Sequence, residues 1–212
     1  MSYHPRVREL QTGLWHWQAP HPSWREEADW PELVSSYAID EGDRLLLFDP
    51  LALPAELEAL AAERSTEILL TCPWHRRDAD ELAGRLRATI RVPPPDDVDQ
   101  EPVGRDRYAA EVVPDAVFRA GDRPSPGVEA FAGLEPNDLV LWVESRRALV
   151  AGDTLIDRGP GLEFPRTWVP EDVTPEQILE AIRPLLELPV EIVLATHGGP
   201  ADRAALESAL SR

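Results

Sequence analysis

Polar side chains that could do chemistry stand directly after apolar runs in this chain. Asp49 follows RLLLF, Cys72 and His75 follow EILLT, Asp153 follows ALVAG, and His197 follows EIVLAT. Carboxylate, thiolate and imidazole groups bind zinc, and they also serve as acids and bases. Because ligands bind beyond the carboxyl ends of strands in sheets covered by helices, these residues predict one shared site.

The basic residues and the missing motifs exclude several kinds of chemistry. All 21 basic residues are arginine, which excludes Schiff-base chemistry, pyridoxal phosphate attachment and a Walker A lysine. The chain has no G-x-S-x-G, H-E-x-x-H or G-x-G-x-x-G motif. Serine hydrolase, zincin and dinucleotide-binding functions therefore have no support in the sequence.

The elements that must position these residues are short apolar strands. Runs of four to six apolar residues without alternation are typical of strands covered on both faces. The predicted strands are 44–50, 67–73, 139–145, 147–154 and 191–198. A further strand before residue 41 is joined to the first of these by the turn EGD, which predicts a hairpin.

Amphipathic helices are expected between the strands. Pro54 suits a first helical position, and Thr174 to Gln177 form a capping box. The proline-rich acidic segment 93–106 is predicted to join two similar halves of one domain that covers residues 1–212. Strands and helices in this order imply two stacked sheets with helices outside them.

Four short motifs together resemble the metallo-β-lactamase fold: FDP, a strand ending in LLT, AGDTL and ATHGGP. The resemblance covers essentially the whole chain and implies an α/β (α+β) fold, a four-layer αββα sandwich. It also implies one or two zinc ions at one edge of the sheets. Asp153 matches the aspartate that usually binds or bridges the metals, and His197 matches the last histidine ligand.

The chain departs from the family where most metal ligands are expected. In the family, the threonine is followed by H-x-H-x-D-H, whereas Thr71 is followed by CPWHRR. The middle histidine of the family is also absent from 119–131. We therefore expect a degenerate metal site with no bound cofactor. If zinc is present, the expected ligands are Asp153, His197, Cys72 and His75.

Arginine side chains stand where the family places metal ligands. Arg76 and Arg77 bring fixed positive charge, and a guanidinium can pair with a carboxylate through two hydrogen bonds. We expect Arg77 to fill the space of a metal ion and to neutralise Asp153, which would otherwise be a buried unpaired carboxylate. Surface positions at a helix start are the alternative for both arginines.

The first functional hypothesis is a hydrolase-derived protein that binds a small anionic or polar ligand and has little or no hydrolytic activity. Asp153, His197 and His75 are its candidate catalytic residues. The candidate ligand-binding residues are Arg76, Arg77, Asp49 and Trp74. Two alternatives stay open: a hydrolase of ester, thioester or lactam bonds with one zinc ion, and a structural or protein-binding role. Whether the chain is an enzyme is left open; if it is, a hydrolase is expected.

Composition limits the partners and the compartment. A net charge of −18 repels phosphate backbones and anionic lipids, so we expect neither nucleic-acid nor membrane binding. One cysteine, no apolar N-terminal run and no membrane-length apolar stretch lead us to expect a cytoplasmic protein. The expected partner is a small molecule, and a homodimer stays open.

Two further residue groups carry alternatives. Cys72 beside His75 is either a nucleophile activated by the imidazole or a small buried apolar residue. Four of the seven tryptophans lie between residues 15 and 30. They are expected to pack in the core and at its edges, or alternatively to form an aromatic wall beside the site.

Overall fold

The computed structural model describes residues 5–95 and 116–211, which form two main sheets. The first sheet has seven strands that lie in the order of the chain. They are β1 (Arg8–Gln11), β2 (Leu14–Pro20), β3 (Leu33–Asp40), β4 (Arg44–Phe48), β5 (Ser65–Leu69), β6 (Thr89–Val92) and β7 (Ala116–Val117). Strands β1 to β4 are antiparallel, whereas β4, β5, β6 and β7 run parallel to one another.

The second sheet has five strands in the order β14-β13-β10-β9-β8. They are β8 (Val128–Ala132), β9 (Leu139–Val143), β10 (Ala148–Val150), β13 (Ile192–Leu194) and β14 (Pro200–Asp202). Strands β10 and β13 are parallel, and the other neighbours are antiparallel. A separate two-stranded sheet contains β11 (Ile156–Asp157) and β12 (Leu162–Glu163).

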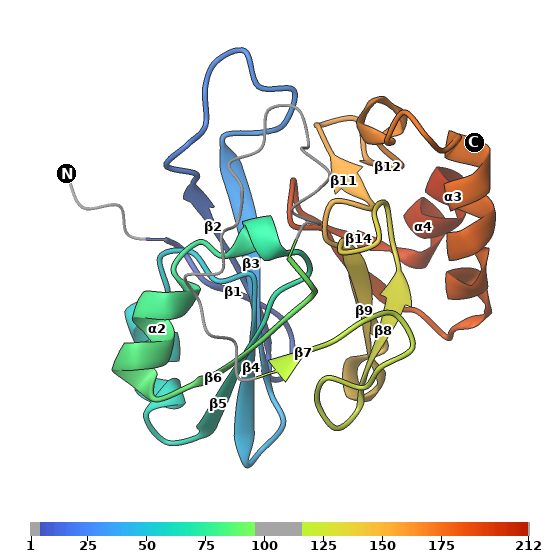
Figure 1. Cartoon of the computed structure of the whole chain (residues 1–212). Coiled ribbons are helices and arrows are strands. Elements are labelled where there is room, and N and C mark those ends of the chain that lie inside the picture. The colour runs from blue at the N-terminus through green and yellow to red at the C-terminus, as the bar shows by residue number, and fades with distance from the viewer. Residues whose placement is uncertain (1–4, 96–115, 212) are drawn as a thin grey trace.

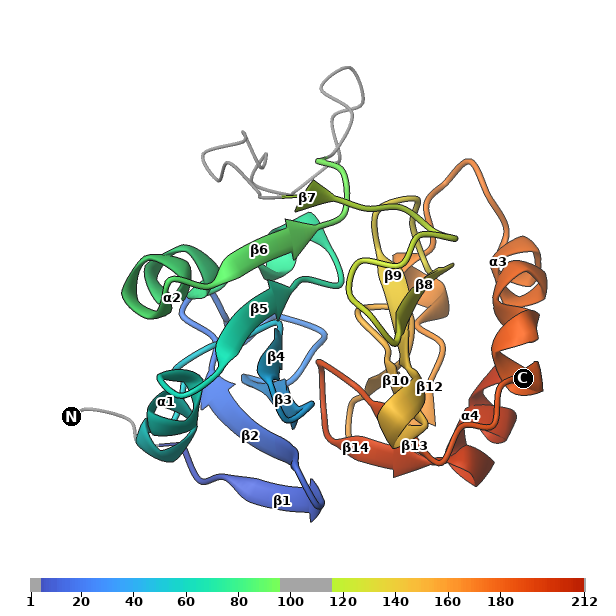
Figure 2. The same cartoon turned by 90° about the horizontal axis from the view of Figure 1, so that it is seen from below.

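Helices cover the outer face of each main sheet. Helices α1 (Ala55–Ala61) and α2 (Ala79–Leu86) lie outside the first sheet, and α3 (Pro175–Ile182) and α4 (Arg203–Leu210) lie outside the second (Figure 2). Short 3-10 turns cover Pro73–His75, Glu144–Arg146, Arg166–Trp168 and Arg183–Glu187. The two sheets face each other (Figure 1), so the predicted αββα sandwich is confirmed.

The alternation of side chains along a strand explains why both faces of each sheet are covered by apolar layers. In β4, Leu45 and Leu47 belong to the cluster that includes Leu57 of α1 and Leu82 of α2. Leu46 belongs instead to the cluster between the two sheets. Successive side chains of a strand point to opposite faces, so an unbroken apolar run supplies both layers.

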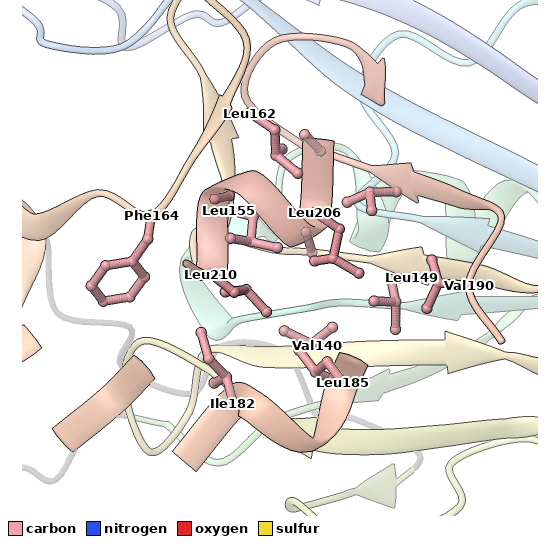
Figure 3. Close-up of a cluster of buried hydrophobic side chains, with 14 of the residues drawn as sticks. Val140, Leu149, Leu155, Leu162, Phe164, Ile182, Leu185, Val190, Leu206 and Leu210 are labelled. Carbon is pink, nitrogen blue, oxygen red and sulfur yellow. The ribbon is translucent and has the colours of Figure 1, made fainter. Parts of the chain in front are cut away.

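The outer face of the second sheet has its own apolar cluster. Figure 3 shows Val140 and Leu149 from the sheet together with Ile182, Leu206 and Leu210 from the helix side. All five are at most 6% exposed. This packing fixes the second sheet against α3 and α4, and with it the loops at the sheet's carboxyl edge.

Several local predictions are confirmed. Strands β3 and β4 form the expected hairpin around residues 41–43. Helix α3 begins at the capping box, in which Thr174 accepts a hydrogen bond from the Gln177 backbone. Pro54 lies one residue earlier than predicted, since it is the N-cap of α1 and not its first helical residue.

The connection between the halves is only partly visible. Most of the predicted joining segment 93–106 lies outside the described residues, so its role stays a prediction, as does the single domain over residues 1–212. Within the residues described, no helix has the length and apolar character needed to cross a bilayer.

Candidate functional site

Four of the predicted site residues meet at one edge of the two sheets. Asp49 follows β4, His75 lies beyond β5, Asp153 follows β10 and His197 lies beyond β13. Each of these strand pairs is parallel, so their carboxyl ends lie at the same edge of their sheet. The backbone of Val34 in the first sheet also bridges to His197, which closes this edge.

Asp49 and Thr71 fix the ring of His75. The buried Asp49 carboxylate accepts hydrogen bonds from the Thr71 backbone N–H at 2.9 Å and from its hydroxyl at 2.6 Å. Nδ1 of His75 lies 3.1 Å from Asp49 Oδ2 and 3.1 Å from Thr71 Oγ1. This contact orients the imidazole, so that its other nitrogen, Nε2, faces Asp153.

Asp153 lies at the centre of the site. Its Oδ1 is 3.2 Å from Nε2 of His75 and 3.2 Å from Nε2 of His197. Its Oδ2 accepts a hydrogen bond from the Trp74 indole at 2.7 Å. Oδ1 is buried, and its two contacts with the imidazoles are ion-pair contacts whose geometry falls short of a hydrogen bond within the described residues.

Burial and neighbouring charges set the protonation of this centre. Burial lowers the pKa of His75, but the carboxylates of Asp153 and Asp49 outweigh it and raise this pKa to about 9. For Asp153, burial raises the pKa, yet His75 and His197 hold it well below its usual value. The pKa of His197 is lowered, mainly by burial. At neutral pH an imidazolium at His75 therefore lies between two carboxylates.

Asp138 is a site residue that the sequence analysis missed. Its carboxylate accepts hydrogen bonds from the Asp153 backbone at 3.0 Å, the Thr154 hydroxyl at 2.7 Å and the Leu134 backbone at 3.3 Å. Burial and the nearby Asp153 raise the pKa of Asp138 to about 7. Its only sequence signal is an acid directly before an apolar strand, a pattern too common to single it out.

The expected pairing of Arg77 with Asp153 is wrong. Nη1 of Arg77 donates to the backbone carbonyls of Ser35 at 2.8 Å and Asp49 at 2.7 Å, and lies 3.4 Å from Ser36 Oγ. Arg77 has a left-handed backbone, with φ of 42°, and its side chain runs to the ends of β3 and β4. His75 takes the place beside Asp153 that was predicted for the guanidinium.

Arg76 and Cys72 lie at the two ends of the turn after β5, and Cys72 is buried. Arg76 pairs with Asp80, one turn further along at the start of α2. Arg76 is partly buried, and its pairing at the helix start agrees with the position that the alternative gave this residue. Burial and the surrounding carboxylates, Asp153 first, raise the pKa of the Cys72 thiol well above its usual value. A protonated thiol is a poor nucleophile, so the raised pKa argues against a catalytic role for Cys72.

One set of side chains in the described residues has the composition of a metal site. Cys72, His75 and Asp153 each offer one ligand atom, and these atoms lie within 4.8 Å of one another. Sulfur, imidazole nitrogen and carboxylate oxygen suit zinc. The carboxylate of Asp49 behind His75 is the outer partner that metal-binding histidines usually have. The donor set therefore fits a single ion.

Aromatic rings cover His197. The rings of Trp30 and Trp168 lie edge-on to it, with centroids 5.0 and 5.8 Å away. His21 contacts Trp30 edge-on at 5.2 Å. Trp17 packs in the apolar layer between the first sheet and its helices. The two roles predicted for the N-terminal tryptophans are therefore both found, since Trp17 belongs to the core whereas Trp30 borders the site.

A polar tether holds this cover in place. The loop between β2 and β3 lies beside the β11–β12 hairpin (Figure 1), and Asp29 joins the two. The Asp29 carboxylate accepts a hydrogen bond from the Trp168 indole at 2.7 Å, and its backbone carbonyl accepts one from Arg158 at 2.6 Å. The Arg158 guanidinium also lies over the Trp168 ring at 5.2 Å.

Comparison by sequence finds no relatives. No protein-family model matches the chain, and no curated protein does either.

Comparison by structure finds the same fold in metallo-β-lactamases. A metallo-β-lactamase from Pontibacter korlensis superposes with a TM-score of 0.70 at 13% identity, covering 98% of this chain and 98% of its own. TMB-1 gives 0.68 at 16% identity, covering 99% and 97%. The BLEG-1 B3 metallo-β-lactamase gives 0.62 at 16% identity, covering 91% and 96%. At such low identity these matches establish the fold alone.

Proposed function

We propose that this chain, which has the metallo-β-lactamase fold, binds a small polar or anionic ligand at a site that supplies its own cation and holds no metal ion. We expect it to have little or no hydrolytic activity. The observation that carries the proposal is the position of His75, whose two ring nitrogens lie 3.1 Å from Asp49 Oδ2 and 3.2 Å from Asp153 Oδ1.

The His75 ring lies between two carboxylates at the centre. The carboxylates of Asp49 and Asp153 lie within 3.2 Å of the His75 ring, and the guanidinium of Arg77 binds the Asp49 backbone carbonyl nearby. A divalent ion would have to displace the His75 proton, because an ion bound in addition to it would leave excess positive charge in a buried site. The proton on His75 therefore supplies positive charge at the place where a zinc hydrolase of this fold has a metal ion.

Two further contacts support a site without metal. Trp74 stands where the family pattern has a histidine, and its indole N–H donates to Asp153 Oδ2. Nδ1 of His197 is buried without a hydrogen bond among the described residues. A metal-binding histidine almost always donates its other N–H to an outer partner, and His197 lacks one.

The experiment is a metal analysis of untagged protein purified in the presence of zinc. We expect far less than one equivalent of any transition metal per chain, and no change of the melting temperature after treatment with a chelator. One tightly bound zinc ion per chain, whose removal lowers the melting temperature, would contradict the proposal.

The second candidate is a hydrolase that uses one metal ion. The buried Asp153 Oδ1 without a hydrogen bond favours it, together with the donor atoms of Cys72 and His75 nearby. An ion held by these three residues would activate water for attack on an ester, thioester or lactam carbonyl. Binding it would release the protons of His75 and Cys72. Zinc-dependent hydrolysis that is lost in Asp153→Asn and in His75→Gln would establish this candidate.

A further inference from the structure

One edge of the Arg77 guanidinium has no hydrogen-bond partner among the described residues. Its Nη1 makes the three polar contacts described above, but Nε and Nη2 are shielded from solvent and form no hydrogen bond with this part of the chain. Among the described residues it is the one arginine with two such nitrogens. These two N–H groups lie side by side and point the same way, which is the fork that binds a carboxylate through two parallel hydrogen bonds.

An open fork of this kind is costly in a folded protein. A buried donor without a partner loses its bonds to water and gains nothing in return, and the cost is larger for a charged group. Arg77 and Asp49 also both hold left-handed backbone conformations, with φ of 42° and 45°. Residues whose backbone conformation costs free energy in this way are common at functional sites.

The groups around Arg77 indicate the kind of ligand. Nη1 of Arg77 binds the Ser35 carbonyl, and Trp30 packs against the cluster that contains the neighbouring Val34. Trp30 also packs against His197, so basic and aromatic groups lie close together here. Since two carboxylates already face two cations here, one extra negative charge is easier to accommodate than two.

We propose that the Nε and Nη2 edge of Arg77 binds the carboxylate of a small molecule with an apolar or aromatic body, which lies against Trp30. This inference rests on the proposed function and names its ligand class. A planar monoanion matches the fork in shape and charge, and the indole offers an apolar surface to the rest of the molecule.

The test titrates the wild-type protein with sodium benzoate, using acetate and inorganic phosphate for comparison. Binding is followed by calorimetry and tryptophan fluorescence. We expect benzoate to bind with a change in fluorescence, acetate to bind more weakly because it lacks the apolar body, and phosphate to bind more weakly than benzoate.

Arg77→Lys is the decisive variant because it keeps the charge and removes the fork. We expect it to bind benzoate at least about tenfold more weakly, the effect of losing one charge-assisted hydrogen bond. Arg76→Lys is the matched control, since the neighbouring Arg76 pairs with Asp80 outside the site. It should bind benzoate like the wild type.

If Arg77→Lys fails to fold, nuclear magnetic resonance of the wild-type protein still tests whether benzoate binds at Arg77. Benzoate should shift the Nε–H signal of Arg77 and leave that of Arg76 in place. Three results overturn the inference: no benzoate binding, equal affinity in Arg77→Lys and wild type, or tighter binding of phosphate than of benzoate. None of these readouts depends on metal content, which tests the proposed function separately.

Discussion

A single histidine lies between the two central carboxylates. His75 is only 4% exposed, and its ring lies between Asp49 and Asp153 within 3.2 Å of each. Desolvation alone would make such an imidazole neutral, yet the two carboxylates outweigh it and raise its pKa to about 9. The buried carboxylates and the imidazolium therefore stabilise one another, and removing any of the three leaves an uncompensated charge.

The stability of the protein should depend on the protonation of His75. Its pKa is about 9 in the folded chain and about 6.5 when unfolded, so its contribution is complete below pH 6.5 and disappears as the pH rises through 9. We expect the difference in unfolding free energy between wild type and His75→Gln to shrink over this window by about 3 kcal/mol. Urea denaturation at a series of pH values measures it.

His16→Gln is the control for this experiment. Burial lowers the pKa of His16 to about 4, so this residue contributes stability above pH 6.5 that is lost as the pH falls through 4. Its variant should therefore alter the pH dependence only on the acid side. A constant difference between wild type and His75→Gln from pH 6.5 to 9 would show that His75 is not the internal cation.

At the scale of elements, tight turns hold the site residues at the sheet edge. The turn after β10 places Asp153, and Asp138 before β9 binds its backbone. Gly152 adopts a positive φ of 56°, and a Cβ added there would collide with the Asp138 carboxylate. Glycine is therefore required at this position for two reasons, the backbone conformation and the close approach of Asp138.

Gly152→Ala separates these two reasons when it is compared with Gly42→Ala. Gly42 also has a positive φ, of 91°, but no atom lies near its missing Cβ. We expect Gly42→Ala to cost about 1 kcal/mol and Gly152→Ala about 2 kcal/mol more, because the second adds a steric collision to the backbone strain. Equal losses in denaturant unfolding would mean that the Asp138 contact is not tight.

The loop over His197 depends on the tether at Asp29. Asp29→Ala removes the acceptor of the Trp168 indole, so hydrogen exchange of residues 21–32 should become faster. The global unfolding free energy should fall by less than about 1 kcal/mol, since Asp29 is exposed. Glu26→Ala, in the same loop, should change neither quantity. Unchanged exchange in Asp29→Ala would show that other contacts hold the loop.

At the scale of the molecule, hydrogen bonds across the interface join the two sheets beside the site. The Tyr37 hydroxyl donates to the Ala195 carbonyl at 2.7 Å, and the Ser35 backbone donates to Thr196 at 2.8 Å. Both bonds join β3 to the segment that leads to His197. The site is therefore shared between the sheets, and it forms only when both are folded and packed.

Tyr37→Phe tests this connection. Losing one buried hydrogen bond should cost about 1–3 kcal/mol, and unfolding should stay a single transition because the sheets share one apolar interface. Ser145→Ala is the matched control, because Ser145 also links the two halves, through Glu41, but at the surface. It should cost less than about 0.5 kcal/mol. Two separate transitions in Tyr37→Phe would contradict a shared interface.

Much of this arrangement is predictable from the sequence, for identifiable reasons. Apolar runs without alternation predict doubly covered strands, and the direction of those strands brings Asp49, Asp153 and His197 to one edge. The path of a side chain is not predictable in this way. Arg77 reaches the carbonyls of the first sheet because of its left-handed backbone, which nothing in the motif CPWHRR indicates.

The most direct test of the account is the protonation state of His75, read from nitrogen-15 resonances of its ring at pH 7.5. His75→Gln assigns the signals, which are few because the chain has five histidines. The account predicts that both ring nitrogens carry protons and still do so after one equivalent of zinc chloride is added. A deprotonated Nε2 at this pH, or its loss of a proton to bound zinc, would contradict it.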